Sequence, residues 1–237
     1  MRRPSWSAKR AFPDRPPRRA SPFREDDACK PITPYQVTKF EAEEALSQID
    51  PKETRLNILR PSGIYGPGSL LEIAVYNKVL TRRWSIELSG GIIVHPTYVG
   101  DVVEAIIALV EEPAPPGTVF NLGGERAILH GALCALIAEM LGVSRRSIVV
   151  PASLAGPFGS IAQVFFALMR RPSPLLAEMS RGRCFSSAVD DRRFRERYPA
   201  VPVTHLADGL REHINWAREQ HLLERPPRAG GPAATSC

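Results

Sequence analysis

Tyr35 and Lys39 stand four residues apart in the run Tyr-Gln-Val-Thr-Lys, and this pair could transfer a proton. On a helix, residues at this spacing share one face, about one turn apart. A tyrosine titrates at about pH 10, too high for a base near neutrality, but a nearby ammonium favours the phenolate. Such a pair could take or return the proton of a hydroxyl whose carbon exchanges a hydride. Because many surface helices carry this spacing, an inert pair is the alternative.

The sequence predicts a helix that positions this pair. Thr33 can cap its first turn, Pro34 suits its first position, and Gln36 completes a Thr-x-x-Gln capping box. We expect the helix to reach about residue 49 and to stop before Pro51. We also expect the phenol and the ammonium to point into one cleft.

Strand and helix signals alternate along the rest of the chain. Short apolar runs predict strands, at about 56–59, 92–94, 119–122 and 148–150. Longer periodic runs predict helices, at about 70–80, 102–112, 133–141 and 206–223. The glycines of residues 63–68 predict a loop. This alternation indicates an α/β sheet.

The helix that precedes Pro113 has a well-marked start. We interpret Asp101 as its N-cap, because Glu104 follows three residues later in the form of a capping box. Five apolar side chains should form the packed side of this helix: Val102, Val103, Ile106, Ile107 and Val110.

Three polar residues beside these elements each have two interpretations. His95 is either a structural hydrogen bonder or a contact in a substrate pocket. Arg60 is either structural or a contact for a substrate or phosphate. Asn121 is either a turn residue or a ligand. The structural role is the commoner one for each, and His95 is kept as the candidate substrate contact.

Five stretches resemble, in the right order, landmarks of the extended short-chain dehydrogenases, which include sugar-nucleotide epimerases, dehydratases and 3β-hydroxysteroid dehydrogenase-like enzymes. Residues 31–43 (PITPYQVTKFEAE) are similar to the active-site helix of that family, and residues 59–68 (LRPSGIYGPG) to the strand and loop that follow it. Residues 95–102, 119–124 and 209–216 resemble the segment before the next helix, a late strand with a glycine turn, and the terminal helix.

The resemblance implies an α/β fold: the C-terminal half of a Rossmann-like doubly wound sheet plus a small substrate-binding region. It implies NAD or NADP as cofactor and a small-molecule substrate, either a sugar nucleotide or a sterol-like compound. Tyr35 would carry the proton, Lys39 would be its electrostatic partner, and Ser7 would polarise the substrate oxygen, unless Ser7 is an unstructured tail hydroxyl. The implied cofactor-binding residues are Tyr35, Lys39, Pro61, Ser62, Gly63 and Ile64.

The glycine-rich turn that holds the cofactor's pyrophosphate in such enzymes has no match in the sequence. The glycines of residues 63–68 and 90–91 lie after the predicted catalytic helix, which is the wrong order. We therefore expect the isolated chain to lack cofactor binding. The alternative function is a non-catalytic piece of such an enzyme. The choice between NAD and NADP stays open, because the residue that makes it would lie in the unmatched part.

Charge is unevenly distributed. The chain has a net charge of +6, but residues 1–24 hold eight Lys/Arg against one acid, Asp14, so this arm is +7 and the remainder is −1. A neutral body argues against nucleic acid as partner. The Pro-rich arm is interpreted as disordered. The four cysteines lack the spacing of a zinc site or a disulfide framework, so free thiols are expected.

The chain is expected to divide into a basic lead-in (1–33), a partial cofactor-binding domain (34–150), a small substrate-binding region (151–224) and a disordered tail (225–237). The apolar stretch 158–171 is either a core helix of the small region or a lid or membrane-surface helix beside an apolar substrate pocket. No apolar run is long enough to span a membrane, and a cytoplasmic location is expected. The resemblance also implies a homodimer.

Overall fold

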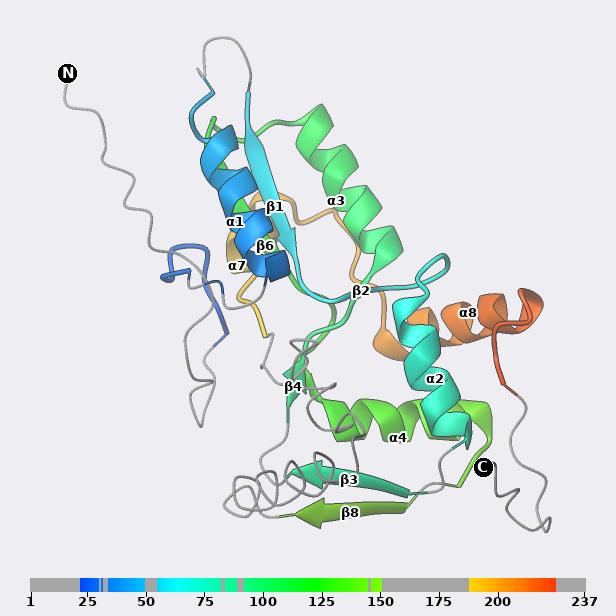
Figure 1. Ribbon diagram of the computed structural model, residues 1–237. Coiled ribbons are helices and arrows are strands. Elements are labelled where there is room, and N and C mark those ends of the chain that lie inside the picture. Colours follow the sequence, from blue (N-terminus) through cyan, green and yellow to red (C-terminus); the bar gives the residue numbers. More distant parts are fainter. Residues whose placement is uncertain are drawn as a thin grey trace, which may run out of the picture.

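The computed structural model describes residues 22–29, 31, 34–49, 55–81, 84–88, 92–144, 146–150 and 188–224, of which 84–88 and 146–150 are described by their backbone alone (Figure 1). The helices are α1 (Pro34–Leu46), α2 (Leu71–Thr81), α3 (Val99–Glu111), α4 (His130–Leu141), α7 (Arg192–Arg197) and α8 (Leu206–Glu219). The strands are β1 (Asn57–Pro61), β2 (Ile64–Tyr65), β3 (Trp84–Leu88), β4 (Ile93–Val94), β5 (Thr97–Tyr98), β6 (Thr118–Leu122), β7 (Ile128–Leu129) and β8 (Arg146–Val150).

Parallel pairing confirms the α/β class. β1 pairs with β6, β2 with β5 and β3 with β8, all parallel, whereas β4 and β7 pair antiparallel. In the β1–β6 pair, Asn57 lies opposite Thr118 and Arg60 opposite Asn121. The β1–β6 connection includes α3, as parallel strands require a crossover. α1 runs back along β1, so its first turn lies toward the carboxyl ends of the pair (Figure 1).

Two apolar cores hold these elements. The first lies among α2, α4 and α8 and includes Tyr76, Ile137 and Ile214, which are at most 2% exposed. The second joins β6 to α3 and α7 through Phe120 and Phe194, whose rings meet edge to face at 5.6 Å. Each core contains residues from before and after residue 150, where the sequence predicts a domain boundary. That boundary stays a prediction.

Most predicted elements are present, with several differences. The predicted loop over residues 63–68 contains β2, and the predicted helix 206–223 ends at Glu219. The sequence prediction missed four elements: β3, β5, β7 and α7. The alternating apolar and polar residues of β3, Trp84–Leu88, are a strand signal that it overlooked. Two-residue strands such as β5 are too short for an alternating pattern, and α7, with its four arginines, has no apolar stripe to detect.

The apolar side expected of α3 is mostly wrong. Val102 and Ala105 are buried against the second core, but Val103, Ile106 and Val110 are 49%, 49% and 72% exposed. The packed side of α3 is therefore narrower than the apolar run in the sequence. Its Val102 and Ala105 pack in the second core with Phe120 and Leu122 of β6.

Residues 22–29 of the predicted lead-in contain no helix or strand but are held against the body by hydrogen bonds, which corrects the expectation of disorder for residues 22–24. Phe23 forms a parallel bridge with Val189, and Phe23 N–H donates to Ala188 O at 2.9 Å. Residues 1–21, the apolar stretch 158–171 and the tail 225–237 lie outside the described residues.

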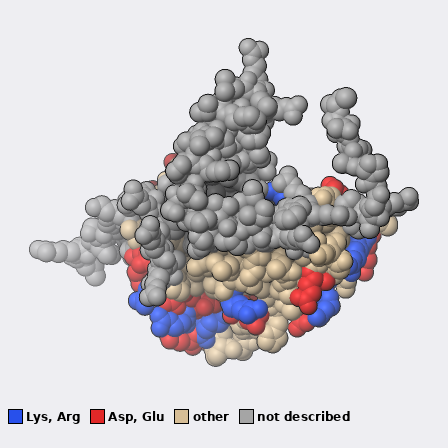
Figure 2. All heavy atoms as spheres, turned by 90° about the horizontal axis from the view of Figure 1, so that it is seen from below, with Lys and Arg blue, Asp and Glu red and all other residues tan. Residues whose placement is uncertain are grey.

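The surface of the described part mixes both signs of charge. On the face in Figure 2, basic and acidic side chains alternate over the lower rim with uncharged residues between them. This distribution agrees with the neutral charge of the body. Among the described residues, Cys29 and Cys134 form no disulfide bond. Within the described residues, no helix is long and apolar enough to cross a membrane.

Candidate active site

Tyr35 and Lys39 share one face of α1, as their spacing predicts. The Lys39 Nζ lies 5.7 Å from the centroid of the Tyr35 ring, within range of a cation–π contact. Both residues lie in the first half of α1, toward the carboxyl ends of the β1–β6 pair, where ligands bind in open α/β sheets. The two groups needed for assisted proton transfer are therefore adjacent.

The phenol of Tyr35 is open to solvent. Tyr35 is 70% exposed. The described residues therefore do not enclose its side chain and do not form the cleft that was expected around it. The side of α1 that faces the body is half-buried and consists of Gln36, Val37, Phe40, Glu43 and Glu44. Tyr35 and Lys39 thus lie on the face of α1 that the described residues leave uncovered.

The turn after β1 is bound tightly on one side and open on the other. Ser62 N–H donates to Leu122 O at 2.9 Å, and the Ser62 hydroxyl contacts both His95 O and Thr97 Oγ1. The resemblance assigns Ser62 to the cofactor, but both its N–H and its hydroxyl group make hydrogen bonds within the protein. Gly63 and Ile64 are exposed, and a Cβ added at Gly63 would meet nothing within 4 Å.

His95 is fixed as a structural hydrogen bonder. Val189 N–H donates to its Nδ1 at 3.3 Å, and its Nε2 lies 3.1 Å from Gly124 O. These partners require the neutral tautomer with the proton on Nε2. The ring is 7% exposed, and a Cβ at Gly123 would lie 2.3 Å from it. Because both ring nitrogens are hydrogen-bonded within the protein, the geometry favours the structural interpretation of His95 over the predicted substrate contact.

Asp101 is not the N-cap of α3, which corrects the capping-box interpretation. Tyr98 occupies that position, without a side-chain cap bond. Asp101 lies in the first turn, is 1% exposed, and accepts hydrogen bonds from Thr204 N at 2.8 Å and Thr204 Oγ1 at 2.6 Å. The carboxylate therefore ties α3 to the segment that leads into α8, a contact that sequence spacing cannot reveal.

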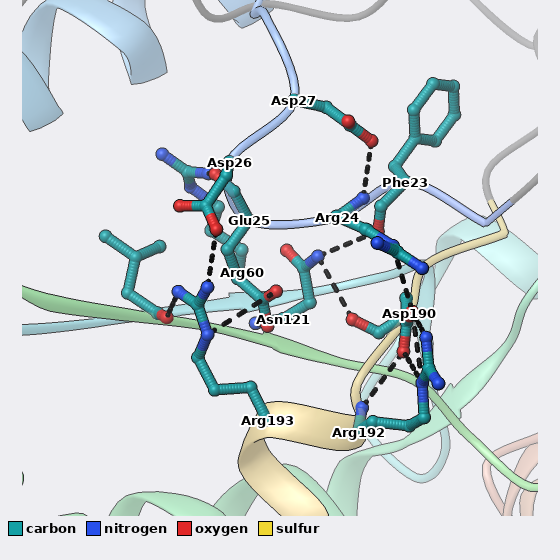
Figure 3. A network of polar contacts seen from close by, with 11 residues as sticks. Phe23, Arg24, Glu25, Asp26, Asp27, Arg60, Asn121, Asp190, Arg192 and Arg193 are labelled. Carbon is teal, nitrogen blue, oxygen red and sulfur yellow. Dashed lines mark hydrogen bonds and ion pairs between the residues drawn. The ribbon is translucent and has the colours of Figure 1, made fainter.

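Asn121 anchors two segments that are distant in sequence to the end of β6 (Figure 3). Its Nδ2 donates to Phe23 O at 2.9 Å and to Asp190 O at 3.3 Å, while its backbone N–H donates to Glu25 Oε1 at 2.9 Å. Glu25 is 5% exposed. Asn121 is thus neither a turn residue nor an evident ligand, but a strand residue that joins both segments.

Charged pairs complete this network. The guanidinium of Arg193 lies 2.6 Å from Asp26 and 4.0 Å from Glu25 (Figure 3). Arg192 binds Asp190 at 2.7 Å, and this hydrogen bond is the main cause that lowers the pKa of Asp190 to about 2. Sequence reasoning missed these residues. The one available signal was the acidic run that directly follows the basic arm.

The described residues fit the nicotinamide end of an NAD(P) cofactor but not its pyrophosphate. The exposed Tyr35–Lys39 face and the open backbone at Gly63 lie at the carboxyl ends of the strands. Within the described residues, one glycine-rich turn, residues 66–70, leads directly into a helix, α2. There the Ser69 hydroxyl binds the carboxylate of Glu72 in the first turn, and this negative charge disfavours a pyrophosphate. Ser7 lies outside the described residues.

Comparison with known proteins supports the resemblance. The sequence model of the RmlD substrate binding domain matches residues 6–158. The uncharacterized protein YbjS of Escherichia coli is 27% identical over 186 residues, 76% of this chain and 55% of that protein. The 3β-hydroxysteroid-dehydrogenase/decarboxylase isoform 1 of Arabidopsis thaliana is 26% identical over 197 residues, 76% of this chain and 45% of that protein. The chain thus spans about half the length of these curated relatives.

A solved structure shares the fold. The dTDP-glucose 4,6-dehydratase of Bacillus anthracis, determined in complex with NAD, superposes with a TM-score of 0.61 at 17% identity, covering 90% of this chain and 59% of that one. This likeness confirms the Rossmann-like α/β class. Because the matched sequence model covers more than half of the chain, the chain belongs to the extended short-chain dehydrogenase/reductase family, as a relative with an RmlD substrate binding domain.

Proposed function

We propose that this chain supplies the proton-transfer side of an NAD(P)-dependent epimerase/dehydratase or dehydrogenase. The observation that carries this proposal is the position of the Lys39 ammonium, 5.7 Å from the Tyr35 ring centroid, on the uncovered face of α1. Tyr35 is the proton carrier, and Lys39 is its electrostatic partner. Pro61 to Ile64 border the nicotinamide end of the site.

The chemistry follows from the two side chains. The phenolate oxygen of Tyr35 accepts the proton of a substrate hydroxyl, and the ammonium of Lys39 stabilises the negative charge that this oxygen carries before the transfer. A bound nicotinamide supplies the hydride acceptor for the same carbon. Tyr35 can later return its proton to the substrate oxygen. With a nicotinamide cofactor bound, the net reaction would be oxidation if the hydride stayed on the cofactor and epimerisation if it returned to the other face of the substrate carbon.

Two substrate classes are compatible with this chemistry. The solved relative is named for a sugar nucleotide, and the plant relative for a 3β-hydroxysteroid. Both classes offer a secondary hydroxyl on a ring carbon, which is the group the Tyr–Lys pair would serve. We propose a sugar nucleotide or sterol-like substrate with such a hydroxyl or the corresponding ketone.

A second candidate function is a non-catalytic relative without cofactor binding. Two observations favour it: the exposed phenol of Tyr35, and the acidic Glu72 at the glycine-rich turn before α2. In this case the Tyr–Lys pair is inherited but idle.

The test replaces the proton carrier in the complete polypeptide that contains this chain. In Tyr35→Phe, kcat should fall by about 10²-fold or more, with little change in cofactor affinity, because only the acid/base group is lost. Tyr198→Phe is the matched control, since it removes a phenol hydroxyl that binds Glu112 O at 2.7 Å, away from the site. Retention of kcat in Tyr35→Phe would show that another group moves the proton.

A further inference from the structure

The helix that carries the proposed proton carrier is not held by apolar burial. No residue of α1 is buried, and its inner side is only half-buried. Helices in proteins normally owe most of their stability to a buried apolar face. The position of α1 against the strands therefore depends on other contacts.

One described ion pair provides such a contact. Arg60 of β1 places its Nε 3.0 and 3.1 Å from the two carboxylate oxygens of Glu43, and its Nη2 lies 2.5 Å from Glu43 Oε2. Both side chains are mostly covered, at 25% and 29% exposure. A forked, partly buried pair of this kind is stronger and more directional than an ordinary surface ion pair.

The same guanidinium reaches a third segment. Arg60 Nη1 lies 3.4 Å from Glu25 O, in the segment that Asn121 anchors to β6. Arg60 and Asn121 are register partners in the β1–β6 pair. Burial disfavours the charged guanidinium, but the hydrogen bond and the charge of Glu43 outweigh it, and the net effect raises the pKa of Arg60. Arg60 thus joins β1, α1 and residues 22–29 as a permanent charge.

Glu43 stands one turn after Lys39 and two turns after Tyr35 on α1. At about 1.5 Å per residue, Tyr35 is about 12 Å along the axis from Glu43, so a tilt of about 10° around Glu43 moves the phenol by about 2 Å. Misplacement of a reacting group by about 1 Å can cost about 10²-fold in rate. A contact that restrains the tilt of α1 therefore has a direct effect on the placement of the phenol.

We propose that Arg60 is a positioning residue that, through its forked contact with Glu43, sets the orientation of α1 and with it the location of Tyr35 and Lys39. The catalytic consequence rests on the proposed function, but the orientation of α1 does not. Arg60 touches neither reacting group and acts only through Glu43.

Hydrogen–deuterium exchange of the full chain measures the orientation part without any activity. Arg60→Gln and Glu43→Gln should each raise amide exchange in residues 34–46 by about tenfold, because a charge-assisted contact is lost. Amides of β6 should stay unchanged. Arg211→Gln is the matched control, since it breaks an exposed Arg–Asp pair on α8, and it should leave residues 34–46 unaffected.

The reciprocal double variant separates positioning from a general loss of stability. Arg60→Glu combined with Glu43→Arg restores an ion pair of reversed polarity, and it should recover much of the protection of α1 that either single variant loses. Unchanged exchange of α1 in Arg60→Gln and Glu43→Gln would overturn the proposal. Equal loss in the single and double variants, or loss shared by β6, would overturn it too.

Activity of the complete polypeptide tests the catalytic consequence. Arg60→Gln should lower kcat while leaving KM and cofactor affinity near their original values, with partial recovery in the reciprocal double variant. A rise in KM at unchanged kcat would assign Arg60 to substrate binding instead and overturn the proposal. If Tyr35→Phe retains activity, the proposed function fails, but the exchange result still decides whether Arg60 orients α1.

Discussion

Replacement of Asp101 distinguishes the two interpretations of this residue. As an N-cap, Asp101 would be exchangeable with Ser at almost no cost, because both are good caps. As a tether, it holds the backbone and side chain of Thr204 at 2.8 and 2.6 Å from a carboxylate that is 1% exposed. We predict that Asp101→Ser and Asp101→Ala both destabilise the protein.

The magnitude follows from the two hydrogen bonds. Hydrogen bonds to a charged group contribute about 1.5–3 kcal/mol each. Thr204 is half-buried, so water can partly replace the carboxylate once it is removed. We therefore expect the free energy of unfolding to fall by about 2–4 kcal/mol in Asp101→Ala, and Tm to fall by several degrees. Thr204→Val, which loses only the hydroxyl contact, should cost about 1–2 kcal/mol.

Urea unfolding followed by circular dichroism measures these changes. In the double variant Asp101→Ala with Thr204→Val, the two losses should not add, because both remove the same hydroxyl–carboxylate contact. A free energy of unfolding for Asp101→Ser within about 0.5 kcal/mol of the original protein would refute the tether and restore the cap interpretation. Full additivity in the double variant would refute it as well.

Two further predictions concern the cores and the β6 turn. Burial lowers the pKa of His213, whose Nδ1 lies 2.9 Å from Tyr76 Oη, so the unfolded chain binds the proton more readily. Stability should therefore be complete above about pH 6.5 and decline as the pH falls below it, and His213→Gln should flatten this dependence in urea titrations at different pH. In Gly124→Ala the new Cβ would lie 2.0 Å from the Pro96 carbonyl oxygen, so Tm should drop by an amount that corresponds to about 1–3 kcal/mol, whereas Gly63→Ala, with open space, should be nearly neutral. Equal thermal stability of the two glycine variants would contradict the packing around Gly124.

Much of the fold was predictable because its signals are local. The Pro34 start of α1, the alternation of apolar runs and the αL glycine that ends α4 at Gly142 are each readable from a few neighbouring residues. The errors arise where distant segments meet. Asp101 has the spacing of a cap, but its partner Thr204 lies 103 positions away.

The candidate site was predictable in part for the same reason. The shared face of Tyr35 and Lys39 depends only on helical spacing, and it is observed. The roles of His95 and Arg60 depend on Gly124, Val189 and Glu43, which no local pattern connects to them. The exposure of Tyr35 depends on what covers α1, and sequence spacing does not contain that information.

The central claim is that this chain holds the proton-transfer side of a nicotinamide site without the turn that binds the cofactor's pyrophosphate. Calorimetric titration of the purified 237-residue chain with NADH and NADPH tests it most directly. We predict very weak or undetectable binding of both cofactors, because the sequence has no match to the glycine-rich turn whose backbone N–H groups would bind the pyrophosphate. Binding of either cofactor by the folded chain with low-micromolar affinity would contradict the claim.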